Sequence, residues 1–279
     1  MVAEKSPNSR KYTDFSIPHY DILAREDIKL HFSNNTFQPP ERYLPEIERN
    51  WRKLLDSPYC RILYDGAMVR LKDFRIEKGK PAFKMELTSY KIFCGTNLRK
   101  PPLPSKECAN GIGICGTIIT ADNKQIVGLR STKVFEGGNQ LHVVGGNLDP
   151  QEHLATDKES HAPDPFTGWQ KEIYEEIGVT VPLEEIRYTG TARNRLTHKP
   201  EITFTTNIDI TSDNLRPASN EHAHLEFFKN SADGIRDFLQ QNWDRITPAG
   251  KSAITAYMLC NYSAFEGAVK WLDENYGAI

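Results

Sequence analysis

The chain has 279 residues, of which 38% are hydrophobic and 26% are charged, a composition typical of a soluble globular protein. The formal net charge of −2 excludes the strongly basic surface that general nucleic-acid binding requires, although a nucleotide-sized ligand needs only a local basic patch. No apolar run reaches the roughly 18 residues of a membrane span, and the polar start of the chain lacks the apolar core of a secretory signal, so we expect a cytoplasmic protein with no membrane or nucleic-acid partner.

The first part of the chain divides into three segments by composition. Residues 1–44 hold few periodic apolar positions and are expected to form an extended or partly ordered arm. Residues 45–105 are expected to form a small α+β domain. Its predicted elements are a helix over 45–56, strands over 60–74 and 81–88, a turn at 77–80 between them, and a proline-rich linker at 100–105.

Residues 106–279 alternate strand patterns with helix patterns, which predicts a mixed α/β sandwich around a sheet. The predicted strands cover 112–120, 125–130, 141–144, 186–194 and 201–210. The predicted helices, besides a glutamate-rich one near residue 172, cover 232–241, 249–262 and 264–276.

Five cysteines are spread along the chain without a Cys-x-x-Cys pair. Their odd number argues against a disulfide framework, so we expect reduced thiols that are mostly packed in the interior, as is usual in a cytosolic protein. They are Cys60, Cys94, Cys108, Cys115 and Cys260.

Three glutamates at helical spacing are the most informative feature. Glu172, Glu175 and Glu176 lie at positions i, i+3 and i+4, which share one face of a helix. Like charges so placed raise one another's pKa unless a cation joins them, and crowded oxygen ligands suit Mg²⁺ or Mn²⁺. Gly178 is suited to end the helix. The competing interpretation is a solvated, glutamate-rich face. An apolar stripe for the core is formed by Trp169, Ile173 and Ile177.

The residues before this helix complete a known pattern. An apolar run over 141–144 ends in two glycines, and Glu152 follows the second, Gly146, after five residues. With the helix, this resembles the Nudix hydrolase signature, G-x5-E-x7-R-E-U-x-E-E-x-G-U, where U is bulky and aliphatic. Lys171 stands at the arginine position, keeping the charge without the bidentate geometry. Residues 153–170, 18 residues in place of seven, form an insertion of 11 that is expected to be a surface loop.

The resemblance implies a Nudix-type α/β/α sandwich and a metal-dependent hydrolase with Mg²⁺, or Mn²⁺, as cofactor. In that family divalent ions bridge the diphosphate oxygens and activate a water, and a glutamate can act as the general base. The implied catalytic residues are Glu172, Glu175, Glu176 and Lys171. The implied metal ligands are Glu172, Glu175, Glu176, the backbone of Gly146, and a loop carboxylate, for which Glu221 is the first choice and Glu226 the second.

The surroundings of Glu221 also permit a simpler interpretation, an exposed loop acid. His222 and His224 alternate as residues on the edge of a strand do. A zinc site would need more ligands at defined spacing, so histidine ligands are not favoured.

Three other stretches resemble one branch of the family, the animal enzymes that cleave UDP-glucose and UDP-galactose to UMP and a sugar 1-phosphate. They cover 87–97, 190–194 with 201–204, and 248–254. That branch also has a long insertion and lacks the arginine. The resemblance implies a small nucleoside diphosphate substrate held by Tyr90, Thr96, Asn97, Arg193 and Asn194. Arg130 is a further candidate for a phosphate contact, from its place beside a predicted strand.

Each of these substrate contacts has a structural alternative. Residues 88–97 could instead be a packed helix capped by Thr88 or Ser89, and Arg193 could form a structural salt bridge. Two other functions remain open. One is hydrolysis of another nucleotide, such as ADP-ribose, a dinucleotide, coenzyme A or a damaged nucleotide. The other is a non-catalytic module that binds a nucleotide or protein, which a cluster of like charges disfavours. The sugar and the oligomeric state are not determined.

Overall fold

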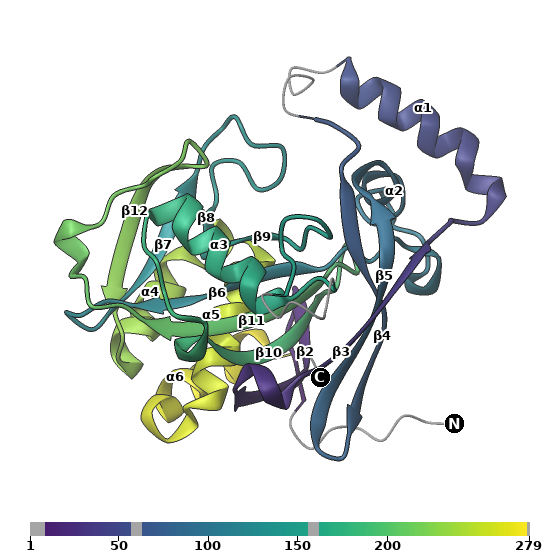
Figure 1. Ribbon diagram of the computed structural model, residues 1–279. Coiled ribbons are helices and arrows are strands. Elements are labelled where there is room, and N and C mark those ends of the chain that lie inside the picture. The colour runs from purple at the N-terminus through teal and green to yellow at the C-terminus, as the bar shows by residue number, and fades with distance from the viewer. Residues whose placement is uncertain (1–8, 57–62, 156–161, 278–279) are drawn as a thin grey trace.

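The computed structural model describes residues 9–56, 63–155 and 162–277, which form two sheets and six α-helices (Figure 1). The large sheet has the strand order β1-β2-β10-β11-β6-β7-β12, with β8 beside β7 and β9 beside β6. A second sheet has the order β3-β5-β4.

The strands are β1 (Arg10–Lys11), β2 (Phe15–Leu23), β3 (Lys29–Thr36), β4 (Ala67–Glu77), β5 (Lys80–Ser89), β6 (Gly113–Ile119), β7 (Lys124–Arg130), β8 (Leu141–His142), β9 (Val144–Asn147), β10 (Arg187–Asn194), β11 (Pro200–Asn207) and β12 (His222–Lys229). The helices are α1 (Leu44–Leu55), α2 (Tyr90–Thr96), α3 (Pro165–Ile177), α4 (Ala232–Asn242), α5 (Pro248–Cys260) and α6 (Tyr262–Tyr276).

The large sheet is mixed and is covered by helices on both faces. Side chains of a strand alternate between faces: Ile114 and Ile118 of β6 pack in one core with Trp169 of α3, whereas Cys115 and Ile119 pack in the other core with α4, α5 and α6. Figure 1 shows α3 on one side of the sheet and these three helices on the other. The predicted α/β/α sandwich with a mixed sheet is therefore confirmed, since β6 and β11 run parallel while the other pairs of this sheet are antiparallel.

Residues 1–44 were expected to form an extended or partly ordered arm, and much of their described part is built into the two sheets. Strand β2 pairs with β10 in the large sheet, and β3 pairs with β5 in the small one, so this segment joins the two sheets. The apolar alternation of β2 is short because a polar residue, His19, takes the next inward position after Phe15 and Ile17 and contacts the Tyr188 hydroxyl at 3.0 Å. A pattern of apolar residues alone does not reveal such a strand.

The small α+β unit follows the sequence prediction more closely. The helix predicted over 45–56 is α1, and the predicted hairpin is β4–β5, whose turn places Lys78 and Gly79 at φ angles of 54° and 78°. Strand β4 begins later than predicted, and residues 57–62 lie outside the described ranges. The division of the chain at residues 44/45 and 105/106 stays a prediction.

The glutamate-rich helix α3 begins earlier than expected, inside the stretch 153–170 that was predicted to be a surface loop, and it ends at the predicted Gly178. The Asp164 carboxylate accepts a hydrogen bond from the Phe166 N–H at 2.8 Å, and Pro165 occupies the first turn, where no N–H is needed. Gly178 ends the helix with a φ angle of 72°. Arg25 contacts Asp164 and so ties the N-terminal segment to this cap.

Two further expectations concern the whole chain. Cys94, Cys108, Cys115 and Cys260 are free thiols, and the first three are buried, as expected; Cys60 lies outside the described residues. Within those residues, none of the helices combines the length and the apolarity that a membrane crossing demands.

Candidate active site

Glu176 is the innermost of the three glutamates, with 1% of its surface exposed. Its Oε1 accepts a hydrogen bond from the Gly145 N–H at 3.1 Å, and its Oε2 lies 2.5 Å from His222 Nε2. Burial, reinforced by the charge of Glu221, raises the pKa of Glu176 well above its usual value, although the Gly145 N–H opposes this. Burial lowers the pKa of His222 to about 4, so the imidazole is neutral at pH 7.

Glu172 lies one turn earlier, directly over the glycine turn. A Cβ on Gly146 would come within 2.1 Å of Glu172 Oε1, so the space that glycine leaves is filled by this carboxylate. Burial raises the pKa of Glu172 strongly, and the charges of Glu176 and Glu221 raise it further. The two carboxylates therefore occupy one site, as the spacing predicts.

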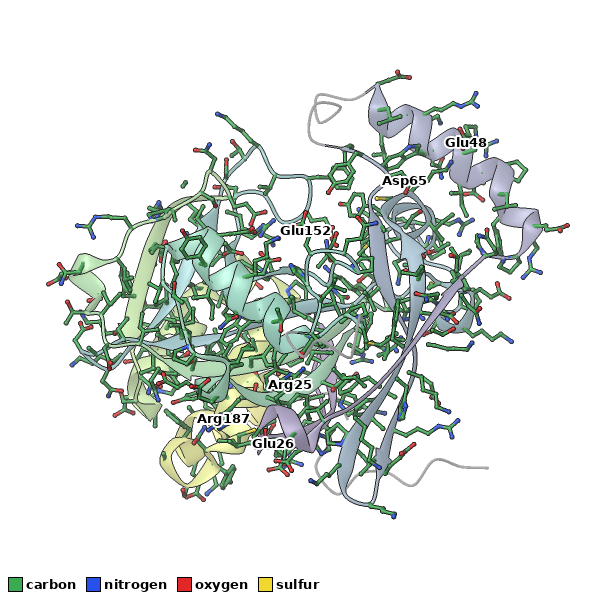
Figure 2. The ribbon with its side chains drawn as sticks, viewed as in Figure 1. Arg25, Glu26, Glu48, Asp65, Glu152 and Arg187 are labelled. Carbon is green, nitrogen blue, oxygen red and sulfur yellow. The ribbon has the colours of Figure 1, made fainter. Side chains whose placement is uncertain are left out.

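Glu175 lies towards the outside of this group. Its carboxylate is 3.5 Å from Lys171 Nζ, and Lys171 also contacts Glu152. Figure 2 shows Glu152 on the side of α3 that faces the small sheet. Lys171 thus holds two neighbouring carboxylates, and neither of them is the buried Glu176.

A cavity of about 450 Å³ opens in front of these glutamates. It lies beside the strand ends of the large sheet, where β6, β11 and β12 begin and β7 ends. Among the described residues that line it, acids outnumber Lys and Arg by six to two. The acids are Glu136, Glu172, Glu175, Glu176, Glu201 and Glu221, and the bases are Arg130 and Lys199. Such an excess of negative charge in a partly buried space favours a bound cation.

Lys199 and Glu201 form a nearly buried ion pair in the cavity wall, with Nζ and Oε1 3.7 Å apart. Glu201 lies against Gly113, where a Cβ would come within 1.7 Å of its Oε2. Burial raises the pKa of Glu201 to about 7, and the charge of Lys199 only partly opposes this. Burial acts against the charge of Lys199, but Glu201 and Glu136 raise its pKa overall.

The side chains of this site supply only part of the ligand shell of a divalent ion, which is what Mg²⁺ usually takes from a protein. Within the described ranges, no three His, Cys, Asp or Glu side chains converge as a ready metal cage. Magnesium usually takes only one or two protein carboxylates and completes its shell with water and substrate phosphates. Two carboxylates are available for this, Glu172 in the space that Gly146 leaves and Glu176 beside Gly145.

The loop carboxylate chosen from sequence also faces this cavity. Glu221 has 42% of its side chain exposed and lies 3.7 Å from Arg130 Nη2. Glu226, the second choice, pairs with His224 at 3.3 Å and does not line the cavity.

A second cavity of about 630 Å³ adjoins the first and is lined by residues of β4 and α2 and by residues 147–149, which follow the glycine turn. Both cavities are lined by Arg130, Glu136, Asn147, Ser219 and Glu221. Aromatic side chains contribute to the second one, and they are Tyr64, Tyr90 and Phe135. The Tyr90 hydroxyl donates to Glu136 Oε1 at 2.9 Å, which connects the two spaces.

Two predicted substrate contacts, at the end of α2 and just after it, do not line either cavity. Thr96 and Asn97 are fully buried. The Thr96 hydroxyl accepts from the Ala109 N–H at 3.0 Å, and the Asn97 side-chain oxygen accepts from the Asn110 N–H at 2.9 Å. The structural alternative holds here, because Ser89 caps α2 by accepting from the Ile92 N–H at 3.5 Å.

The three remaining residues that were predicted to contact the substrate lie in different places. Arg130 lines both cavities. Asn194 lines the glutamate cavity, but its side-chain oxygen is engaged by the Leu196 and Thr197 N–H groups at 2.8 and 3.0 Å. Arg193 faces away into another cavity and donates to Ser105 Oγ and the His198 carbonyl, so it does not join the glutamates.

Sequence reasoning missed several residues of the cavity wall. Lys199, Glu201 and Glu136 line the cavity but carry no spacing signal relative to α3. His142 is also buried there, with Nδ1 2.6 Å from Thr247 Oγ1. His222 contacts Glu176 without lining the cavity, and the sequence indicates it only as a strand-edge residue. Only the excess of acids in the assembled fold shows that these residues belong together.

Comparisons with known proteins find no matching family model and no matching curated protein. Solved structures do resemble the chain, at low similarity. A bifunctional NMN adenylyltransferase/ADP ribose pyrophosphatase from Francisella tularensis is 12% identical, with a TM-score of 0.37 over 54% of this chain and 41% of that one. The matched part thus spans less than half of that protein.

Two further structures are matched over most of their own length. A Nudix hydrolase from Nitrosomonas europaea is 16% identical, with a TM-score of 0.37 over 55% of this chain and 90% of that one. An Ap4A hydrolase from C. elegans is 16% identical, with a TM-score of 0.35 over 56% and 97% of the two chains. The solved structures to which this chain is similar therefore include hydrolases of the Nudix type.

Proposed function

We propose that the chain is a metal-dependent Nudix hydrolase that cleaves the diphosphate of a nucleoside diphosphate sugar, UDP-glucose or UDP-galactose, to UMP and a sugar 1-phosphate. One observation carries the proposal: Glu172 and Glu176 meet over the glycine turn, inside a cavity with six carboxylates and two basic side chains. A binding module for a phosphorylated ligand alone would gain nothing from this surplus of negative charge.

The residues of the cavity are assigned different roles according to their chemistry. Glu172, Glu176 and the backbone of Gly146 would hold Mg²⁺ or Mn²⁺, which when bound neutralises diphosphate oxygens and acidifies a water. Arg130 and Lys199 supply the positive charges that face phosphate oxygens, and the guanidinium does so with two parallel hydrogen bonds. Glu175 and Glu221 remain as carboxylates that could accept the proton of the attacking water.

The second cavity supplies a place for the nucleoside. It adjoins the glutamate cavity through Arg130 and Glu136, so one substrate can span both. Tyr64 and Tyr90 offer aromatic faces on which a base can stack. The UDP-sugar assignment itself rests on the three stretches of sequence that resemble that branch. The expected cytoplasmic location agrees with the free thiols of the cysteines that the structure describes.

The experiment that tests the proposal is a substrate panel with purified protein, scored by kcat/KM in Mg²⁺ and in EDTA. The panel contains UDP-glucose, UDP-galactose, ADP-ribose, a dinucleoside polyphosphate and coenzyme A. The proposal expects the highest kcat/KM for a UDP-sugar and no turnover in EDTA. A preference for another nucleotide would keep the enzyme class and reject the substrate.

A non-catalytic nucleotide-binding module is the second candidate. The position of Lys171, turned to Glu152 and Glu175 rather than to Glu176, favours it. Calorimetry with Mg²⁺ and UDP-glucose separates the two functions, because heat of binding with no UMP formed would support the module and reject the enzyme.

A further inference from the structure

Both oxygens of Glu176 are held by other parts of the fold. His222 is the first residue of β12, 46 positions after Glu176, and its Nε2 lies 2.5 Å from Glu176 Oε2. The Gly145 N–H holds the other oxygen at 3.1 Å. Neither contact comes from α3, so the orientation of this carboxylate depends on the large sheet.

Strand β7 is shaped to admit the imidazole. A Cβ on Gly128 would come within 2.2 Å of His222 Nδ1, so only glycine leaves space for the ring at this position. The β12–β7 ladder also shifts register between His222 and His224, and such an irregularity redirects a side chain. The side chain of His222 is completely buried as a result.

The second ring nitrogen indicates the tautomer. His222 Nδ1 is buried and has no hydrogen-bond partner. A buried acceptor without a partner is tolerated more often than a buried N–H without one. The proton is therefore assigned to Nε2, which donates it to the Glu176 carboxylate.

From this geometry we infer that His222 is the positioning residue of the metal site: its Nε2–H and the Gly145 N–H fix Glu176 so that the free lone pairs of the carboxylate face the ion. The inference rests on the proposed metal-dependent function. Polar groups that orient a ligand in this way set both its direction and its basicity. Lys171 cannot do this for Glu176, because its ammonium group is turned to Glu152 and Glu175.

The test measures Mn²⁺ binding by electron paramagnetic resonance of free Mn²⁺, with no substrate present. We expect His222→Leu to weaken binding about 10- to 100-fold. His222→Gln should restore most of the affinity, since its amide N–H can reach the place of Nε2–H. His224→Leu is the matched control on the exposed side of the same strand and should bind as the wild type does.

Gly128→Ala provides an independent approach that keeps the histidine. Its Cβ would displace the ring, so it should weaken Mn²⁺ binding even if His222→Leu fails to fold. Wild-type affinity in His222→Leu or in folded Gly128→Ala would overturn the positioning role while leaving the metal site intact. A wild-type protein that binds no Mn²⁺ would overturn the proposed function and this inference with it.

Discussion

Glu172 occupies the space that a side chain on Gly146 would need, with 2.1 Å between the Glu172 Oε1 and the position of such a Cβ. The neighbouring glycine is required for a different reason, since a Cβ on Gly145 would lie 2.2 Å from the Ile114 carbonyl oxygen. The first clash involves the end of a flexible side chain and the second involves backbone. The missing side chain of Gly146 therefore leaves space for the site, whereas the missing side chain of Gly145 leaves space for the backbone of the fold.

Replacing each glycine by alanine should separate these roles. Gly146→Ala should keep the thermal stability near that of the wild type but displace the Glu172 carboxylate and lower kcat/KM about 100-fold, a loss of about 2.7 kcal/mol. Gly145→Ala should instead lower the free energy of unfolding by about 1–3 kcal/mol. Steady-state kinetics and thermal melts measure the two effects, and full activity in Gly146→Ala would contradict the assignment of Glu172.

The two arginines predicted from sequence should now differ. Arg130 faces the glutamates, so Arg130→Ala should lower kcat/KM by about 100-fold or more, because a charge-assisted contact to phosphate is lost. Arg193→Ala serves as the matched comparison and should change stability but leave kcat/KM within about threefold of the wild type. Equal losses of kcat/KM in both variants would show that the cavity is not where phosphate binds.

Tyr64 tests the nucleoside part of the proposal, because 75% of its surface is exposed and it lines the second cavity. Tyr64→Ala should raise KM about tenfold with little change in kcat, as loss of one stacking contact predicts. Tyr262→Ala, at an exposed aromatic on α6, is the control. Kinetics with the best substrate of the panel would show an unchanged KM if the base lies elsewhere.

The raised pKa of Glu201 predicts that the free energy of unfolding depends on pH. Its folded pKa of about 7 exceeds the ordinary value of 4.5, so the folded state binds the proton more tightly. The resulting stability is present below pH 4.5 and is lost as the pH rises through 7. Relative to Glu201→Gln, the wild type should lose about 3 kcal/mol of unfolding free energy across this range. Urea unfolding at pH 4.5 and 7.5 measures it, and a constant difference between the two proteins would contradict the raised pKa.

The glutamate helix and its glycine turn could be predicted because their signals are local. Apolar residues at helical spacing and an end at Gly178 lie within one stretch of sequence, whereas the start at Pro165 falls inside the stretch 153–170 that was expected to be a surface loop. The partners of Glu176 could not be predicted in this way. His222 reaches it from a strand 46 residues later, and Gly128 makes room from a third segment.

The interior positions of Thr96 and Asn97 could not be predicted for a similar reason. Thr96 and Asn97 are polar and lie in a stretch that resembles a nucleotide-binding branch, yet their side chains satisfy the N–H groups of Ala109 and Asn110 in the interior. Sequence shows that a polar group is present but not which backbone amide it faces. The N-terminal strands were missed because their pairing partners, β10 and β5, lie far away in the chain.

The most direct test of the central claim is an anomalous difference map from crystals of the protein soaked in Mn²⁺. We predict a peak in the glutamate cavity within coordination distance, about 2.2 Å, of carboxylate oxygens of Glu172 and Glu176. A map with no peak there, from a protein that still hydrolyses a nucleoside diphosphate, would contradict the account.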